Sequence, residues 1–256
     1  MNHTAYIAFL TIVRKETVRF MRIWTQTLLP SVITSTLYYL IFGAFLGSRI
    51  GTIEGVSYMA FIVPGLVMMA VITNAYGNVS SSFFSAKFMK NIEEVMVAPV
   101  PHGVVIWGFV VGGTLRGIAV GLLSLAVALF FTQLPVVHPF IILAFFVVTS
   151  VLFSLGGLIN GVFAKSFDSV MIVPTFVLTP LTYLGGVFYP IAVLPQFWEA
   201  LSYANPILYL VNGFRYGFLG VSDVGVTTAL LVLGVCTALL TYLAWYLFDR
   251  GYGLRP

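Results

Sequence analysis

The chain has 256 residues, of which 60% are hydrophobic and only 8% are charged, and its mean hydropathy is +1.04. A soluble domain averages about 25% charged residues, so this composition excludes an ordinary surface in contact with water. Cys236 is the one cysteine and falls in an apolar run, which excludes a disulfide framework.

Six apolar runs are each long enough to cross a bilayer, since a hydrocarbon core about 30 Å thick takes roughly 20 helical residues. Closed β-barrels can also span membranes, but these runs are too long and too uniformly apolar for alternating strands. We therefore predict an all-α membrane protein with a single transmembrane domain over residues 1–256. The predicted spans are residues 26–46, 57–82, 104–132, 139–163, 169–188 and 224–248.

Lys and Arg predict the orientation, because short loops that carry them stay on the cytoplasmic side. With six spans both termini lie on one side, which holds nine basic residues, while the opposite side holds only Arg49 and Arg215. We expect a multi-pass protein of a bacterial inner membrane with both termini in the cytoplasm. The net charge of +4 is then a topology signal, and no nucleic-acid partner is expected. The nine residues are Arg14, Lys15, Arg19, Arg22, Lys87, Lys90, Lys165, Arg250 and Arg255.

Residues 1–24 have the pattern of a basic amphipathic helix lying in the membrane interface. Apolar side chains recur every three or four residues, while the basic residues fall mostly elsewhere on the helical wheel. The helix either anchors the chain to anionic lipid or also contacts a cytoplasmic partner, and both can be true. The apolar positions are Tyr6, Leu10, Val13, Thr17, Phe20 and Trp24.

The second predicted span is unusually polar in its cytoplasmic half, and the fifth carries several hydroxyl groups. Polar groups inside a membrane face protein or a cavity, because hydrocarbon leaves them unpaired. Interhelical hydrogen bonding is the alternative reading. Pro174 and Pro180 would also make the fifth span easier to bend. The candidates for a substrate path are Asn74, Tyr76 and Asn78 in the second span, and Thr175, Thr179, Thr182 and Tyr183 in the fifth.

The loop after the second span predicts a short cytoplasmic helix. Phe84, Phe88, Ile92, Val95 and Met96 form an apolar stripe with charged residues around it, and prolines end the helix before the third span. Such a helix either docks in a groove of another protein or rests on the bilayer. The pattern alone favours neither reading.

Arg116 is the one basic residue well inside a predicted span. A guanidinium in that position is costly unless paired, which makes it a functional candidate, but it lies near enough to the cytoplasmic side to snorkel. We interpret it as structural. No acidic residue lies deep in a predicted span, which argues against one alternative for the function of this chain, a proton-coupled secondary transporter.

Residues 189–220 are too apolar for a free loop and too broken by proline for a full crossing. We predict two short helices that re-enter the outer leaflet, with the turn at Asn205-Pro206, because the residue before a proline is biased away from helix. Leu184, Gly185 and Gly186 precede this segment, and we expect them to form an outer gate together with Asn205 and Pro206.

Two strings, IEEVMVAPVP (92–101) and the run from Lys165 to Gly220 with its ordered Pro, Gly-Gly and Asn-Pro signals, resemble the permeases of ABC-2 type transporters. Lys90-Asn91 stands where that family often has Gly-Thr. The resemblance implies a homodimer with two copies of a separate ATPase, which holds ATP and Mg²⁺, so this chain binds no cofactor or metal. It also implies that the second and fifth spans of the two copies line the path of an amphipathic, lipidic or glycan-type substrate. Its implied ATPase interface is Arg14, Arg19, Phe88, Ile92, Glu93, Glu94, Val95, Met96 and Pro99.

The absence of a GxxxxGK[ST] phosphate loop agrees with an ATPase on another chain. The three histidines all lie outside the predicted spans, so the pattern of an intramembrane protease is missing. We expect a conduit for transport and no enzyme activity on this chain.

Overall fold

The computed structural model describes residues 3–53 and 55–253, and in this range the side chains of Ala44, Ser48, Glu93, Val95 and Met96 lie outside the described part. The chain is almost entirely helical, as predicted. The N-terminal half comprises α1 (His3–Arg22), α2 (Trp24–Thr27), α3 (Leu29–Tyr38), the π-helix η1 (Tyr39–Leu46), α4 (Gly47–Ile50), the antiparallel strands β1 (Thr52–Ile53) and β2 (Val56–Ser57), α5 (Tyr58–Phe88), α6 (Asn91–Val97) and α7 (His102–Ala128). The second half comprises α8 (Pro139–Phe163), α9 (Phe167–Val173), the π-helix η2 (Pro174–Leu178), α10 (Thr179–Tyr183), the 3₁₀ turn η3 (Ile191–Val193), α11 (Gln196–Tyr203), α12 (Pro206–Leu219) and α13 (Val226–Arg250).

Four of the described helices, α5, α7, α8 and α13, are long and apolar enough to cross a membrane. The first predicted span corresponds to α3, η1 and α4 in succession, and the fifth to the shorter apolar segment Phe167–Tyr183. The helix of the predicted span 104–132 ends at Ala128, and that of span 169–188 ends at Tyr183. The count of six crossings therefore stays a prediction.

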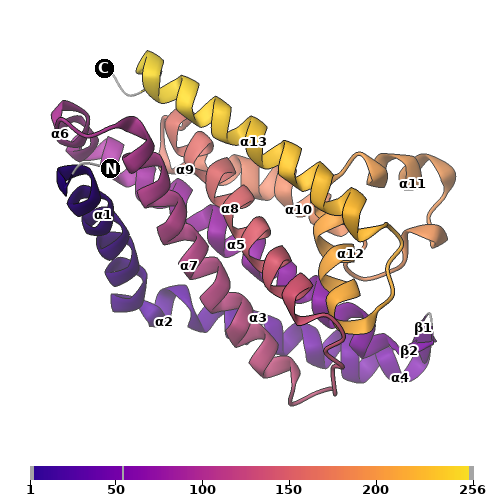
Figure 1. Cartoon of the computed structure of the whole chain (residues 1–256). Coiled ribbons are helices and arrows are strands. Elements are labelled where there is room, and N and C mark those ends of the chain that lie inside the picture. Colours follow the sequence, from indigo (N-terminus) through magenta and orange to yellow (C-terminus); the bar gives the residue numbers. More distant parts are fainter. Residues whose placement is uncertain (1–2, 54, 254–256) are drawn as a thin grey trace.

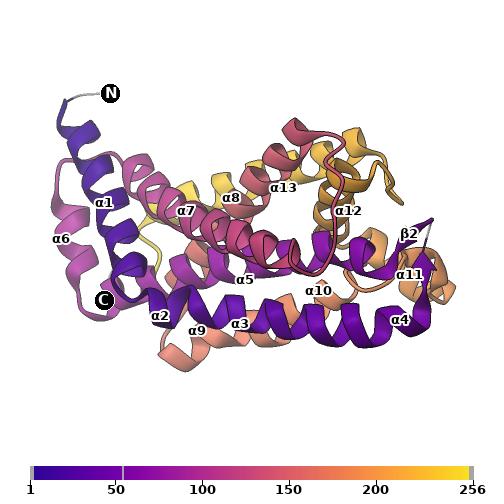
Figure 2. The ribbon, with the colours of Figure 1, turned by 90° about the horizontal axis from the view of Figure 1, so that it is seen from below.

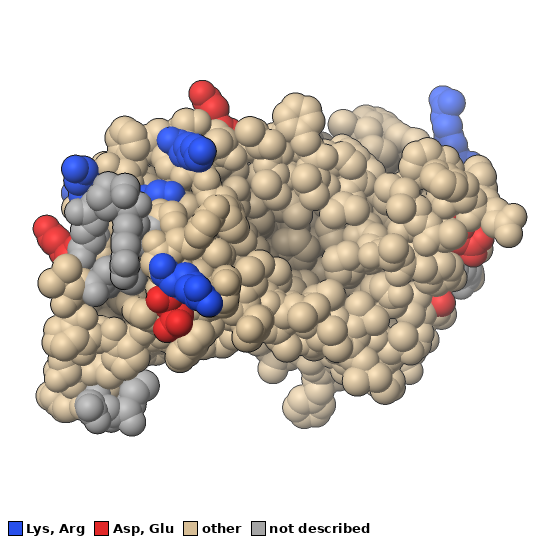
Figure 3. All heavy atoms as spheres, turned by 90° about the horizontal axis from the view of Figure 1, so that it is seen from above, with Lys and Arg blue, Asp and Glu red and all other residues tan. Residues whose placement is uncertain are grey.

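The helices run between two ends of the molecule (Figures 1 and 2). The two ends of the chain lie at one end beside α1 and α6, and α4, the β1–β2 hairpin and α11 lie at the opposite end. In the face shown in Figure 3, charged side chains gather at these two ends and the surface between them is uncharged. Such a surface fits hydrocarbon between two polar boundaries.

Helix α5 is the centre of the subunit, and most of its residues are buried. Glycines allow α7 and α8 to approach it closely: a Cβ on Gly117 would lie 2.9 Å from that of Ala75, and one on Gly157 would overlap the carbonyl oxygen of Tyr76. Small residues spaced by four are the usual means of close helix packing in membranes. The glycines spaced by four on α7 (Gly113, Gly117 and Gly121) and on α8 (Gly157 and Gly161) thus serve contacts within one subunit.

Helix α1 packs along α7, and the sequence does not reveal which of its faces does so. The side of α1 that faces protein carries the buried residues Ala5, Glu16 and Phe20. A Cβ on Gly108 would lie 2.7 Å from Ile12 Cγ2, and one on Gly112 would overlap Glu16. By contrast, Tyr6 is 52% exposed, so part of the predicted apolar stripe faces outward, where it can meet lipid.

Two helices, α11 and α12, occupy the outer segment, and Asn205 caps the second of them. Its side-chain oxygen accepts a hydrogen bond from the Ile207 amide (3.0 Å), and Pro206 takes the first helical position, where a missing N–H costs nothing. The Asn205 amide also donates to the Leu181 carbonyl at the end of α10 (2.6 Å). Whether these helices enter the membrane from the outer side stays a prediction.

The close crossing of α5 and α8 predicts a strong response to one methyl group. Gly157→Ala should lower the free energy of unfolding by about 1–3 kcal/mol, because the new Cβ meets backbone that cannot move without separating the helices. Gly234→Ala on α13 is the matched control, since its Cβ would have no neighbour within 4 Å. Thermal unfolding in detergent measures both, and equal melting temperatures for the two variants would contradict this account of the core.

Candidate functional site: the open stripe of helix α5 and its charged end

One side of α5 stays uncovered along the middle of the helix. Between Ala60 and Ala86 nearly every residue is buried, but Met69, Thr73, Gly77 and Ser81 are partly or fully exposed at intervals of four residues. A Cβ on Gly77 would find no atom within 4 Å. Residues four apart lie on one face of a helix, so these positions form a continuous open stripe of small or unbranched side chains.

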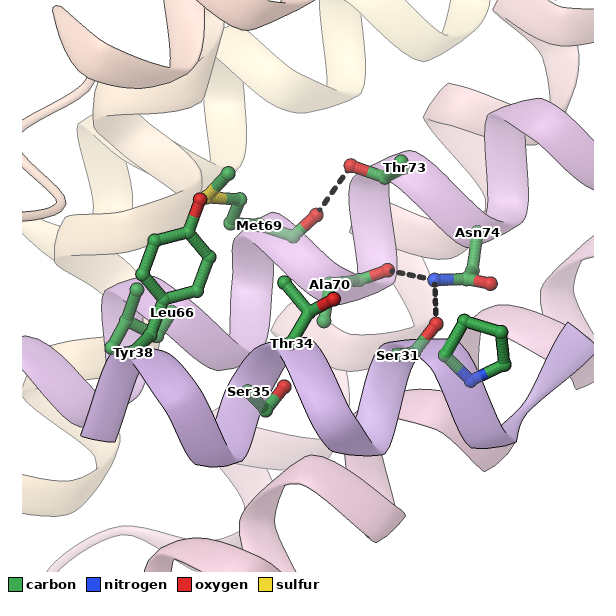
Figure 4. Close-up of a pocket in the computed structure, with 10 residues that line it drawn as sticks. Ser31, Thr34, Ser35, Tyr38, Leu66, Met69, Ala70, Thr73 and Asn74 are labelled. Carbon is green, nitrogen blue, oxygen red and sulfur yellow. Dashed lines mark hydrogen bonds between the residues drawn. The ribbon is translucent and has the colours of Figure 1, made fainter. Parts of the chain in front are cut away.

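A cleft of about 210 Å³ lies on one side of this open stripe, between α3 and α5 (Figure 4). The amide of Asn74 donates to Ser31 Oγ and to the Ala70 carbonyl, both at 3.0 Å, and so ties the two helices together at one end of the cleft. Its walls combine apolar and hydroxyl-bearing side chains: Pro30, Ser31, Thr34, Ser35, Tyr38, Leu66, Met69, Ala70, Thr73 and Asn74.

A second cleft, of about 290 Å³, lies on the other side of the stripe, between α5 and the α9–η2–α10 segment. Met69 and Thr73 line both clefts, so the stripe separates two neighbouring hollows. Tyr76 Oη is buried beside this cleft without a hydrogen-bond partner in the described part of the chain. The remaining lining residues are Met171, Pro174, Thr175, Leu178, Thr179 and Thr182.

The two prolines shape the wall of the second cleft. Pro174 begins the π-helical turn η2, and Pro180 follows within the next turn. A proline removes one backbone donor and disrupts the helical ladder, which leaves carbonyl groups to be satisfied by other donors. Thr179 Oγ1 donates to the Pro174 carbonyl (2.9 Å) and Thr182 Oγ1 to the Leu178 carbonyl (2.7 Å). These threonine hydroxyls bond within the broken helix and line the cleft, and the carbonyl that Pro174 leaves free, that of Val170, accepts from Asn160 Nδ2 (2.9 Å).

A charged cluster lies at the end of the stripe nearest α6, where α1, α5 and α7 meet. Glu16 is fully buried, pairs with Arg19 (Oε2 to Nη2, 3.2 Å) and accepts a hydrogen bond from Ser82 Oγ (2.7 Å). Arg19 also donates to Asn78, at Oδ1 (2.8 Å) and at the backbone oxygen (3.0 Å). The cluster holds α1 against the second span, and the sequence reading did not include Glu16.

Arg116 of α7 joins the same cluster from the other side. Its guanidinium donates to Asn74 Oδ1 (3.1 Å), Asn78 Oδ1 (3.4 Å) and the Thr27 carbonyl (3.4 Å). The side chain is partly exposed, and these contacts direct its guanidinium towards α2 and α5. These contacts link α2 and α5 to α7.

Most predicted path residues meet at the clefts. Asn74 lines the first cleft, and Tyr76, Thr175, Thr179 and Thr182 line the second. Two residues differ: Asn78 is fully buried beneath the two arginines, and Tyr183 stacks on Phe188 (centroids 5.8 Å apart). Neither of these two lines the clefts described above.

The predicted ATPase interface surrounds α6 at the same end of the molecule as α1 (Figure 2). Arg14, Phe88, Glu94 and Pro99 are exposed, whereas Arg19 is engaged with Glu16 and Asn78. Ile92 is only 1% exposed and packs into the subunit's own core, so it anchors α6 instead of projecting from it. The side chains of Glu93, Val95 and Met96 lie outside the described part.

The start of α6 explains one departure from the family pattern. Lys90 adopts φ +61°, a left-handed conformation that favours glycine, at the position where the resemblance noted above leads one to expect Gly. A lysine there costs about 1 kcal/mol relative to glycine. The turn before α6 is thus retained without the glycine.

The predicted outer-gate residues lie together. Leu184 ends α10, Gly185 packs against Ile207 so closely that a Cβ would lie 2.7 Å from its Cγ2, and Gly186 turns with φ +70°. Asn205 and Pro206 start α12 beside them.

Arg215 holds this region from within, a role that the sequence reading did not assign. It is 1% exposed, donates to the Gly186 carbonyl (2.7 Å) and the Phe61 carbonyl (3.2 Å), and lies 3.8 Å from the centroid of the Phe61 ring. A single charge within the apolar run 207–219 was the available signal.

The described residues contain no group of three or more His, Cys, Asp or Glu side chains placed to hold a metal ion. The polar groups along the two clefts are instead hydroxyls and the amide of Asn74. Such groups can bind and release a passing molecule, because they offer hydrogen bonds without a reacting nucleophile.

Comparison with known proteins identifies the family to which this chain belongs. Residues 7–219 match the family described as ABC-2 type transporter. The chain is 58% identical to the inner membrane transport permease YadH of Escherichia coli K12 over the full length of both proteins. It is also 24% identical to nodulation protein J of Rhizobium leguminosarum bv. viciae, over 77% of this chain and 78% of that protein. The chain therefore belongs to the ABC-2 type transporter family and is a multi-pass transport permease of an inner membrane.

Proposed function

We propose that this permease is the transmembrane subunit of an ATP-driven exporter and that its substrate moves along the open stripe of α5. The observation that carries the proposal is the stripe itself. Helix α5 is buried on its other sides and leaves Met69, Thr73, Gly77 and Ser81 uncovered, with a cleft on each side of this row. The mixed apolar and hydroxyl lining suits an amphipathic, lipidic or glycan-type molecule.

A second copy of the chain completes the path in this proposal. One stripe is a half-open groove, and two stripes facing each other across a two-fold axis would enclose a channel. Closed two-fold symmetry is the commonest arrangement of identical subunits. Helix α3 and the α9–η2–α10 segment, which border the clefts, would then meet their counterparts in the partner copy.

The energy source is two copies of a separate ATPase subunit that hold ATP and Mg²⁺, while this chain binds no cofactor. Exposed apolar side chains at the end of α5 and on α6 support a docking surface there: Phe88 is 63% exposed, Met89 66% and Val97 86%. Charges nearby, such as Glu94 and Arg14, would fix the register of the contact. This arrangement places α1, α6 and both termini in the cytoplasm.

A proton-coupled secondary transporter is the alternative, and the buried carboxylate of Glu16 is the observation that favours it. However, Arg19 lies 3.2 Å away and Ser82 donates to the other carboxylate oxygen, so both oxygens of Glu16 are engaged within the subunit. Glu16 also belongs to α1, which precedes the first predicted span. We therefore favour ATP as the driving force.

The proposed ATPase contact is tested by reversing one charge. Glu93→Lys should abolish stimulation of the co-expressed ATPase by the permease while membrane insertion remains normal, because the helix that bears residue 93 lies between predicted spans. Glu199→Lys, the same change on α11 at the opposite end, is the matched control. Co-purification and ATP hydrolysis in nanodiscs are the measurements. Full coupling in Glu93→Lys would refute the assignment.

The proposed dimer path is tested by cross-linking across the stripe. In a Cys236→Ser background, Thr73→Cys should give a covalent dimer with a short bis-maleimide, because the two stripes face each other. Val235→Cys on α13, which is 59% exposed, should give none, since that helix would face lipid. Gel mobility in native membranes reads both variants. Cross-linking at residue 235 alone would place the partner copy against α13 and would contradict the proposed interface at the α5 stripe.

The proposed topology is tested by labelling intact cells. Gln196→Cys on α11 should react with an impermeant maleimide from the periplasm, and Arg250→Cys should react only after the membrane is permeabilised. Reaction at residue 250 in intact cells would mean an odd number of crossings. The Cys236→Ser parent protein gives the background.

A further inference from the structure

The charged cluster at the end of the stripe carries more positive than negative charge. Arg19 and Arg116 both donate to Asn78 Oδ1, at 2.8 and 3.4 Å. In the described part of the chain the one ion pair joins Arg19 to Glu16, so Arg116 has no acidic partner there. One carboxylate therefore stands against two guanidinium groups, and one positive charge is left over.

The left-over charge lies on Arg116, whose acceptors are all neutral. They are the Asn74 and Asn78 side-chain oxygens and the Thr27 carbonyl, at 3.1 to 3.4 Å. Three further donors, Arg116 Nε, Arg19 Nε and Asn78 Nδ2, have no hydrogen-bond partner among the described residues. A cation within a membrane helix is costly without a counter-charge. An anion from outside the chain would supply that charge.

The cluster is placed to meet a molecule in the groove. Asn74 accepts from Arg116 and donates to Ser31, and both Asn74 and Ser31 line the cleft between α3 and α5. The Arg19 side chain, which is 31% exposed, opens to the surface beside the same end of the stripe. Further along, Tyr38, Leu66 and Met69 provide an apolar wall. The groove is therefore apolar along its length and cationic at one end.

We propose that the Arg19–Arg116 cluster binds the phosphate or a similar anionic headgroup of an amphipathic molecule whose apolar part lies between α3 and α5. This inference rests on the proposed function and narrows its substrate class to anionic amphipaths. The headgroup neutralises the charge on Arg116, and Asn78 Nδ2 and the unpartnered arginine donors are available to it after small side-chain movements. A phosphate joined to a lipid and free phosphate share this chemistry.

The test measures protection of a cysteine beside the cluster. Ser81 Oγ and Arg19 Nη2 share the Asn78 carbonyl oxygen, at 3.3 and 3.0 Å, so Ser81→Cys in a Cys236→Ser background reports on this site. Its reaction rate with an uncharged maleimide is measured in phosphatidylcholine nanodiscs and again with phosphatidylglycerol added. We expect phosphatidylglycerol to slow the reaction about fivefold, the effect of one basic group on an anionic lipid.

Two variants should change this protection in opposite directions. Arg116→Met should abolish it, whereas Glu16→Gln should increase it, because glutamine keeps an oxygen for Ser82 but removes the competing negative charge. A purely structural cluster would lose protection in both variants or in neither, and either result would overturn the proposal. Arg22→Met, on the exposed face of the same helix, controls for general attraction of anionic lipid and should leave protection unchanged.

Further arms separate the sources of the anion. Sodium phosphate at matched ionic strength replaces phosphatidylglycerol: protection by the lipid alone assigns a lipid-borne headgroup, and protection by both assigns any phosphate. Protection by neither overturns the proposal. If Arg116→Met does not fold, the increase expected for Glu16→Gln still decides the matter. The assay contains no ATP and no second protein, so a failure here is distinct from a failure of ATP-driven export.

Discussion

The close contact of α5 with α7 and α8 is the constraint on which the rest of the structure depends. Glycines at the crossings, such as Gly117 and Gly157, bring these helices together without intervening side chains. In hydrocarbon, helix association rests on packing and on hydrogen bonds, since lipid tails are as apolar as leucine. With α5 fixed on that side, α1, α3 and the broken α9–η2–α10 segment are left to define the edges of its open face.

The polar residues of α5 form two groups that the sequence alone does not separate. Tyr76 lines a cleft, whereas Asn78, only two residues later, is covered by Arg19 and Arg116. Polarity in the second span correctly indicated protein or cavity in place of lipid. Whether a given residue faces a cleft or packed protein depends on where α1 and α7 cross α5. These crossings are tertiary contacts, which the local sequence pattern does not specify.

Hydropathy and breaker residues predicted the helical class, the positions of the long helices and the helix break at Asn205-Pro206 from local rules. They could not predict the partners of Glu16 or Arg215, because those contacts join segments far apart in the chain. The amphipathic pattern of residues 1–24 identified a helix, yet its protein-facing side carries Glu16. That side chain is buried, and Arg19 and Ser82 contact its two carboxyl oxygens.

The burial of Arg215 bears on the order in which the subunit assembles. Two of its hydrogen-bond acceptors, the carbonyl oxygens of Phe61 and Gly186, precede it in the chain. During synthesis the earlier segments emerge first. Helix α12 therefore emerges after these two acceptors, which lie on α5 and on the turn after α10. It carries the charge of Arg215, which is costly to place in hydrocarbon. Helix α12 can therefore pack in place only after α5 and the turn after α10 have packed. In a subunit with a misplaced α5, Arg215 would lack the Phe61 carbonyl as an acceptor.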